Sequence, residues 1–267
     1  MELNVDMELP SNSNNLKRKK HKKRLIRKRA LLKRQMDDEN IRACDIDARV
    51  VTGYKSFYNR KVKRIIDTIL ASFILIMISP IFLVVSLGIL LEDGFPILYR
   101  AERGGYKNKP FKICKFRSMI KNADKVGGDT TALNDDRITK VGSIIRKMKI
   151  DETPNLLNVI RGDMSFIGPR PELLHYTEQY TGTEKTIFEV RPGMTDYSSL
   201  EFINLDEIVG SQNADEMYEC HVLPRKNKLR VKYAATVSFS TDLKLFFLTI
   251  WKVLEKSYGF VVEKKHR

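Results

Sequence analysis

Hydrophobic residues are concentrated in one long segment of the chain. From Ile65 to Leu91 the sequence is apolar over 27 residues, with Asp67 as its single charged side chain. A helix of that length can cross the hydrocarbon core of a bilayer. Ser79 and Pro80 lie near its middle, and proline removes a helix hydrogen bond while its ring clashes with the preceding turn. The pattern therefore predicts a membrane helix that breaks or kinks at Ser79-Pro80, with the Ser79 hydroxyl donating to an upstream carbonyl.

Basic side chains flank this apolar segment on both sides. Lys61, Lys63 and Arg64 precede it, and five lysines and arginines follow it between residues 100 and 112. Because cytoplasmic flanks of membrane helices carry an excess of such residues, both flanks are expected in the cytoplasm. The helix satisfies this if it enters the membrane, turns at Ser79-Pro80 and returns to the same face. A kinked helix that spans the bilayer is the alternative.

Shorter patterns after residue 92 predict a cytosolic domain with a β-hairpin. Residues 95–99 and 111–116 are alternating runs around a Gly104-Gly105 turn, which is typical of a hairpin. Its polar face carries Lys115 and Arg117. These two side chains could contact phosphates, or they could simply be solvated.

Two further stretches predict helices. Residues 138–150 are helix-like and basic. Residues 242–254 have a wide apolar face and a narrow polar one. The second stretch fits either an interfacial helix, with Trp251 at headgroup depth, or a core helix of the domain.

Two adjacent carboxylates, Asp151 and Glu152, carry the candidate chemistry. Asp151 suits the N-cap of a helix that Gly162 ends. At a helix N-terminus the dipole and the free amides attract phosphate and keep Asp151 ionised, as a nucleophile requires. Arg146 and Arg170 lie on either side in the sequence and can each bind phosphate oxygens through two hydrogen bonds. An aspartate that only caps a helix is the alternative.

Composition narrows the class of protein. With 42% hydrophobic and 30% charged residues, the chain as a whole is not disordered. Its net charge of +15 favours an anionic partner, such as acidic lipid, nucleic acid or a phosphorylated substrate. The three cysteines, Cys44, Cys114 and Cys220, lack metal-site spacing and indicate reduced thiols in a cytosolic compartment.

The first 60 residues are expected to form a basic, disordered extension. A run rich in lysine and arginine from Lys17 to Arg34 could bind anionic membrane lipid, or it could be a solvated tail. Nucleic acid is the weaker candidate, because residues 1–53 contain no Phe, Tyr or Trp that could stack on bases.

Several short motifs occur in one order between Lys61 and about Lys256. They are Lys63-Arg64-x-x-Asp67, Ser79-Pro80, Lys115-Phe116-Arg117-Ser118-Met119, Asp135-Asp136-Arg137-Ile138-Thr139, Asp151-Glu152, Asn158-Val159-x-x-Gly162-Asp163-Met164-Ser165, Gly168-Pro169-Arg170-Pro171 and Arg191-Pro192-Gly193-Met194-Thr195. In these motifs the chain resembles the bacterial sugar transferase family, the monotopic polyprenyl-phosphate phosphoglycosyl transferases.

The resemblance implies an enzyme that transfers a sugar 1-phosphate from a UDP-sugar to undecaprenyl phosphate and releases UMP, with Mg²⁺. Such a reaction is the first membrane step of exopolysaccharide, capsule or other surface glycan synthesis, at the cytoplasmic face of the bacterial inner membrane. In this family the aspartate of the Asp-Glu pair attacks the donor and forms a phosphosugar intermediate, which the lipid phosphate resolves in a ping-pong mechanism. Asp151 would take that role here.

The resemblance also implies roles for the other motif residues. Glu152 would help to position or deprotonate the partners, and Arg146 and Arg170 would bind phosphates. Lys63 and Arg64 would lie at headgroup level near the polyprenyl phosphate, and Ser79-Pro80 would make the re-entrant turn. Asp151 is the expected protein ligand of Mg²⁺. Residues 196–200 depart from the pattern of many members, so the sugar stays open.

The expected fold is a monotopic membrane protein that is mainly α with a short β-hairpin. It would consist of the extension at residues 1–60, a re-entrant helix-break-helix at 61–92, a cytosolic catalytic domain with interfacial amphipathic helices at 93–258 and a basic tail at 259–267. Anionic lipid is an expected partner and a homo-oligomer is possible, whereas nucleic acid is not expected.

Two other function classes remain as alternatives. A basic, nucleic-acid-binding membrane protein would not need Asp151-Glu152 beside phosphate-binding arginines, and its affinity should fall steeply with salt. A non-catalytic scaffold of a polysaccharide complex would keep the membrane helix and tolerate Asp151→Asn.

Overall fold

The computed structural model describes residues 52–126, 131, 135–209 and 214–265. The chain divides into two units, residues 1–44 and 45–267. The first unit lies outside the described residues, as does most of the predicted N-terminal extension with its basic run.

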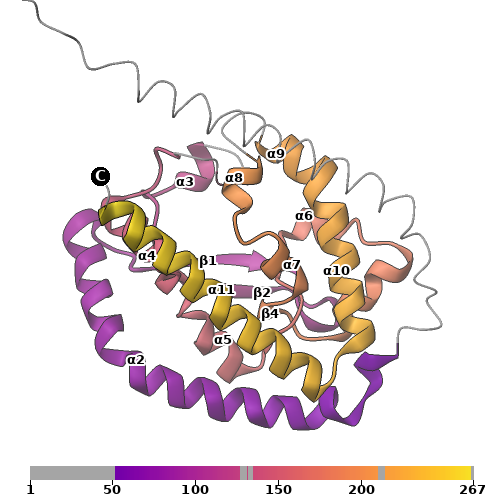
Figure 1. The fold of residues 1–267 in the computed structure, drawn as a ribbon. Helices are drawn as coiled ribbons and strands as arrows, with labels where there is room; N and C mark the ends of the chain where they lie inside the picture. Colours follow the sequence, from indigo (N-terminus) through magenta and orange to yellow (C-terminus); the bar gives the residue numbers. More distant parts are fainter. Residues whose placement is uncertain (1–51, 127–130, 132–134, 210–213, 266–267) are drawn as a thin grey trace, which may run out of the picture. The chain divides into compact units, whose positions relative to one another are not determined.

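The apolar segment forms one long helix, α2 (Lys63–Asp93), preceded by a π-helical turn at Tyr58–Val62. Within the described residues it is the one helix long and apolar enough to cross a membrane. The helix continues through Pro80, so the expected break is a bend within a continuous helix, and Figure 1 shows α2 changing direction partway along its length.

The predicted hydrogen bond at the bend is present. The Ser79 hydroxyl donates to the carbonyl of Ile76 at 2.8 Å. Ile76 lies four residues before Pro80, so its carbonyl would accept the N–H that proline lacks. The hydroxyl satisfies the carbonyl that the proline leaves without a helical donor, which matters where no water is available.

Both halves of α2 pack against the same domain. Before Pro80, Ala71 lies in a cluster with Leu156 and Val159 of α5 (Asn155–Arg161). After Pro80, Val85 and Ile89 pack against Ile145 of α4 (Lys140–Lys147) and Phe116. The bend therefore lets a single helix follow the surface of one domain.

The predicted hairpin is confirmed. Strands β1 (Leu98–Arg103) and β2 (Phe111–Phe116) are antiparallel, with Leu98 opposite Phe116 and Arg103 opposite Phe111. The first strand begins three residues later than predicted, after Pro96, whose missing N–H cannot join a ladder.

A second, parallel pair of strands was not predicted. It joins β3 (Ser165–Ile167) to β4 (Gly193–Thr195). Strands of three residues are too short to show an alternating pattern. Glycine is required here, because a Cβ on Gly193 would lie 2.1 Å from the backbone nitrogen of Gly168.

Short helices and turns connect these elements to two longer C-terminal helices. The remaining α-helices are α3 (Ala123–Val126), α6 (Leu174–Thr177), α7 (Tyr197–Glu201), α8 (Leu205–Val209), α9 (Ala214–Met217), α10 (Leu223–Thr236) and α11 (Phe239–Lys265). The 3₁₀ turns are Gly53–Lys55, Tyr106–Asn108, Ile150–Glu152 and Gly182–Glu189, and a second π-helical turn at Tyr218–Val222 leads into α10.

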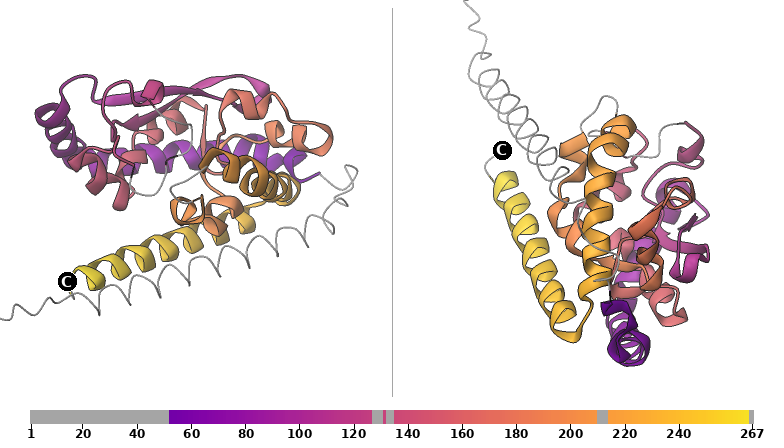
Figure 2. Two further views of the ribbon diagram at one scale, coloured as in Figure 1. Left: turned by 90° about the horizontal axis from the view of Figure 1, so that it is seen from above. Right: turned by 90° about the vertical axis from the view of Figure 1, so that its right-hand side faces the viewer.

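The C-terminal helix α11 has a buried core face and also exposed apolar side chains on other faces. Figure 2 shows it along one side of the domain. Leu245 is fully buried in a core cluster with Tyr233 of α10, so one face is a core face. On other faces of the same helix, Phe247, Trp251 and Leu254 are each more than 60% exposed, which is unusual for a helix surrounded by water.

Candidate active site

Asp151 and Glu152 lie in a 3₁₀ turn between α4 and α5. The N-cap of α5 is Pro154, so the prediction that Asp151 caps this helix is wrong. The reason is local: Lys149 adopts a left-handed conformation with φ 58°, and the chain then makes an extra turn in which the Thr153 N–H donates to the Ile150 carbonyl at 3.0 Å. Gly162 ends α5 as predicted, with φ 96°.

Glu152 is held by two cations from other elements. Arg170 donates from Nη1 to Oε2 at 2.9 Å and from Nη2 to Oε1, and Lys115 of β2 donates to Oε1 at 3.0 Å. Burial alone would raise the pKa of Glu152, but Arg170 and Lys115 outweigh it and hold the pKa well below its usual range. Glu152 is therefore a fixed, ionised carboxylate.

Asp151 has the opposite environment. Its side chain is 7% exposed, and within the described residues its carboxylate has no hydrogen bond or ion pair. Burial raises the pKa of Asp151, and the charge of Glu152 raises it further, against the lowering effect of Lys115, Arg146 and Lys149. Asp151 is not the N-cap of α5, so the expected capping bond to free helix amides is not formed. Instead, a carboxylate without a partner faces several cations, which is a typical setting for a reactive group.

The two arginines predicted to bind phosphates are placed differently. Arg170 is committed to Glu152 and also donates to the Met194 carbonyl at 3.3 Å. Arg146 lies on α4, close enough to lower the pKa of Asp151, and its Nη1 donates to the Ser118 hydroxyl at 3.4 Å. No carboxylate pairs with Arg146 within the described ranges, so its guanidinium is available to a phosphate.

Arg117 does not belong to this site. Its guanidinium donates to the carbonyls of Asp93 at 2.9 Å, of Gly94 at 2.7 Å and of Pro96, and it pairs with the Asp93 carboxylate at 2.8 Å. The side chain is 7% exposed. Its neighbours are the carbonyls at the C-terminal end of α2, so Arg117 closes that helix and the phosphate role predicted for it is not supported.

The two basic residues predicted near the lipid phosphate also have internal partners. Lys63 is buried and pairs with Asp242 of α11, which also accepts from the Tyr58 hydroxyl at 2.8 Å. Arg64 donates to the carbonyls of Val159 and Ile160, the latter at 2.6 Å. Both residues fasten α2 to the rest of the domain.

The site fits a magnesium ion that is shared with substrate phosphates. The described residues contain no group of three or more His, Cys, Asp or Glu side chains that could hold a metal by themselves. Mg²⁺ is commonly bound by one or two carboxylates together with substrate phosphates and water. The unpaired carboxylate of Asp151 suits this requirement, whereas the oxygens of Glu152 are occupied by Arg170 and Lys115.

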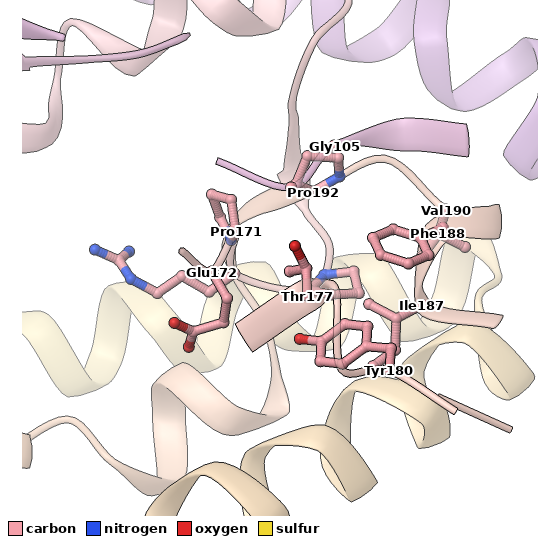
Figure 3. Close-up of a pocket in the computed structure, with 12 residues that line it drawn as sticks. Gly105, Pro171, Glu172, Thr177, Tyr180, Ile187, Phe188, Val190 and Pro192 are labelled. Carbon is pink, nitrogen blue, oxygen red and sulfur yellow. The ribbon is translucent and has the colours of Figure 1, made fainter. Parts of the chain in front are cut away.

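A shallow pocket adjoins Arg170, and its residues were largely missed from the sequence. Its lining includes Gly105, Arg170, Glu172, Tyr180 and Phe188 (Figure 3). The sequence feature that could have pointed to this pocket is Glu172, which directly follows the Gly168-Pro169-Arg170-Pro171 motif. The aromatic lining gave no signal, because Tyr180 lies outside the helices and strands and Phe188 lies in the short 3₁₀ helix Gly182–Glu189.

Asp151→Asn and Glu152→Gln form a matched pair, since each replaces a carboxylate by an amide of the same shape. Asp151 has a raised pKa, so its charge destabilises the folded state above the unfolded pKa of about 3.9. We expect Asp151→Asn to raise the melting temperature at pH 7.5 by about 2–4 °C, equivalent to ~1 kcal/mol in a domain of this size. The gain should vanish as the pH falls towards about 4.

Glu152→Gln should lower the melting temperature at pH 7.5. Its pKa is depressed, so its charge stabilises the folded state above the unfolded pKa of about 4.3, and that stabilisation is lost as the pH falls through the lower folded value. Thermal unfolding in detergent followed by circular dichroism measures both variants. If both substitutions shifted the melting temperature in the same direction, the opposite pKa shifts assigned to Asp151 and Glu152 would be contradicted.

Comparison with known proteins agrees with the motifs. A sequence model described as "Bacterial sugar transferase" matches residues 58–256. The chain is 37% identical over 194 residues to the "Uncharacterized sugar transferase EpsL" of Bacillus subtilis, which covers 72% of this chain and 87% of that protein. It is 34% identical over 198 residues to the UDP-glucose:undecaprenyl-phosphate glucose-1-phosphate transferase of Escherichia coli, covering 73% of this chain and 40% of that protein.

A third relative carries a different sugar in its name. It is the UDP-N-acetylgalactosamine-undecaprenyl-phosphate N-acetylgalactosaminephosphotransferase of Aeromonas hydrophila, 40% identical over 119 residues, covering 45% of this chain and 28% of that protein. The chain thus spans less than half the length of the Escherichia and Aeromonas relatives. Because the family match covers most of the chain and EpsL is matched over most of its length, the chain belongs to the bacterial sugar transferase family.

Proposed function

We propose that this protein transfers a sugar 1-phosphate from a UDP-sugar to undecaprenyl phosphate and releases UMP. The observation that carries the proposal is the asymmetric carboxylate pair, in which Glu152 is fixed by Arg170 and Lys115 while Asp151 has no partner among the residues that the structure describes. The names of the Escherichia and Aeromonas relatives support the donor and acceptor classes. Family membership gives no support to a nucleic-acid-binding role.

In the first half of the reaction Asp151 acts as the nucleophile. A carboxylate oxygen attacks the β-phosphorus of the UDP-sugar and forms an aspartyl–phosphosugar bond. The bond from that phosphorus to the bridging oxygen breaks, and UMP leaves with the electron pair. Arg146 is placed to bind the donor phosphates, since its guanidinium has no carboxylate partner among the described residues.

In the second half the lipid phosphate takes the sugar phosphate. An oxygen of undecaprenyl phosphate attacks the same phosphorus, and the bond to Asp151 breaks and restores the carboxylate. Phosphate monoesters are already largely ionised near pH 7, and Glu152 has a depressed pKa that makes it a weak base. Glu152 therefore positions Arg170 and Lys115 and does not need to remove a proton.

Magnesium is the expected cofactor, with Asp151 as its protein ligand. When bound, the ion neutralises charge on the phosphates. The pocket beside Arg170 offers room for a part of the donor beyond its phosphates, because Arg170 belongs both to this pocket and to the carboxylate pair. Since relatives with different sugars match this chain, the sugar is left to experiment.

The membrane surface of the protein is assigned to α2 and α11. Large apolar side chains of α2 are exposed on both sides of its bend, among them Ile69, Phe73 and Leu83, and Trp251 of α11 is 69% exposed. Exposed patches of this kind mark membrane or protein contacts. Because both halves of α2 pack on one domain, we infer that α2 is re-entrant and that the domain lies at the cytoplasmic face of the bacterial inner membrane.

The activity is tested by UMP release. Purified protein is incubated with undecaprenyl phosphate, Mg²⁺ and a panel of UDP-sugars, and Asp151→Asn serves as the variant. We expect lipid-dependent UMP release with at least one sugar and a loss of about 10³-fold or more in Asp151→Asn, because the amide cannot form the covalent bond that Asp151 is proposed to make. Equal turnover of both proteins would contradict the role of Asp151. No turnover by folded wild-type protein with any sugar would favour the non-catalytic scaffold.

The re-entrant course of α2 is tested by labelling from either side of the membrane. Arg60→Cys and Phe95→Cys place exposed cysteines before and after the helix, in a chain whose native cysteines are replaced. A membrane-impermeant maleimide should label both in inverted vesicles and neither in intact spheroplasts. Labelling of one position from each side would show instead that the helix spans the bilayer.

A further inference from the structure

A buried polar cluster lies directly behind the arginine that holds Glu152. Glu172 follows Arg170 by two residues, and its carboxylate accepts from Arg230 of α10 and from the Tyr218 hydroxyl. The Lys226 ammonium lies 3.9 Å from the same oxygen of Glu172. The Arg230 side chain is 0% exposed, so α10 places a fully buried guanidinium against this carboxylate.

Burying the charged groups of this cluster is electrostatically unfavourable, and the hydrogen bonds that compensate for it hold the side chains in a defined geometry. Burying a charge is unfavourable unless partners satisfy it. Arg230 Nη1 also donates to Asn227 at 3.0 Å and to the Tyr180 hydroxyl at 3.4 Å. Burial alone would raise the pKa of Glu172, but Arg230 and Lys226 lower it to about 2. Since buried ion pairs are often no more stabilising than apolar packing, a cluster of this kind suggests a role in holding a position.

The backbone of Arg170 is fixed on both sides. Before it, the Gly168 N–H donates to the Thr195 carbonyl at 2.9 Å, and the Pro169 carbonyl accepts from Gly193 at 2.9 Å. Both bonds tie the segment, which continues from β3, to β4. On this side the position of Arg170 is set by the parallel strand pair.

After Arg170, the segment is held through Glu172. Pro171 restricts its own φ, and the Glu172 carbonyl accepts from the Gly104 N–H at 3.0 Å. The Glu172 side chain is fixed by Arg230 and Tyr218. Figure 3 shows Glu172 next to Pro171 at the edge of the pocket. The hairpin turn, α10 and the arginine segment therefore meet at this one residue.

We propose that Glu172, anchored by Arg230 and Tyr218, is a positioning residue that fixes Arg170 and through it the orientation of Glu152 beside Asp151. This inference rests on the proposed function for its kinetic consequence, but not for its structural one. Among the described residues Glu172 bonds to neither Asp151 nor Glu152, so its effect on these two carboxylates passes through Arg170. An error of about 1 Å in a positioned group can lower a rate by about 10²-fold.

The chain offers a matched pair of tyrosines for the test. Tyr218→Phe removes a buried hydroxyl that donates to Glu172, and Tyr58→Phe removes a hydroxyl that donates to Asp242 at 2.8 Å. Tyr218 begins the π-helical turn that leads into α10, and Tyr58 begins the π-helical turn that leads into α2. The Tyr58 hydroxyl bonds to α11 and, within the described residues, not to the Arg170 segment, so Tyr58→Phe controls for general loss of an internal hydrogen bond. Glu172→Gln completes the set.

The structural part is measured by amide hydrogen exchange with mass spectrometry on the full-length protein without substrate. We expect Glu172→Gln and Tyr218→Phe to speed exchange in peptides that cover Gly104 and residues 150–154, and Tyr58→Phe to leave these peptides unchanged. Unchanged exchange in both peptides for Glu172→Gln would overturn the proposal, whatever reaction the protein catalyses.

The kinetic part is a double-mutant cycle on UMP release. Glu172→Gln should lower kcat by about 10-fold or more with less than a ~3-fold change in KM, within the range that misplaced groups produce. In an Arg170→Lys background the same substitution should lower kcat by less than about 2-fold, because the anchored group is already altered. A loss as large as that in the wild-type background would show that Glu172 acts on general stability and would overturn the proposal.

The two measurements separate the proposal from the function on which it rests. Faster exchange near residues 150–154 without UMP release from any UDP-sugar would keep the positioning role and remove the proposed reaction. UMP release with unchanged exchange, and with effects of Glu172→Gln and Arg170→Lys on kcat that simply multiply, would keep the proposed reaction and remove the positioning role.

Discussion

The pairing of Glu152 with Arg170 and Lys115 is the interaction on which the rest of the site depends. One carboxylate takes both cations, and its neighbour Asp151 is left buried without a partner among the described residues. Two adjacent and chemically similar groups thereby acquire opposite pKa shifts. Such a division is how an active site gives two carboxylates different roles. Here it separates a fixed carboxylate, Glu152, from the one that we propose reacts, Asp151.

The fold builds this pair from distant parts of the chain. Lys115 comes from the hairpin, the carboxylates come from the turn before α5, and Arg170 follows β3, the first strand of the parallel pair. The bent helix α2 underlies these parts, because its two halves pack on α5 and on α4. Lys63 and Arg64 fasten the beginning of that helix to α11 and α5. This apolar helix is therefore part of the structure that carries the site.

Features set by local chemistry were predictable from the sequence, and features set by distant contacts were not. The apolar helix, the hairpin, the end of α5 at Gly162 and the Ser79 hydrogen bond each depend on neighbouring residues, and all are confirmed. The turn at Asp151 was missed because the left-handed Lys149 has no sequence signature. The internal partners of Arg117, Lys63 and Arg64 were not predictable, because a basic side chain does not reveal which distant carboxylate or carbonyl it will meet.

The central claim is that Asp151, and not Glu152, becomes covalently modified. Purified protein would be incubated with a UDP-sugar that it turns over and with Mg²⁺, in the absence of lipid, and digested with trypsin. Cleavage after Lys149 and Arg161 releases one peptide with both carboxylates, and fragmentation locates any added mass. The account predicts a sugar phosphate on Asp151. An adduct on Glu152, or no adduct in protein that releases UMP once undecaprenyl phosphate is added, would contradict it.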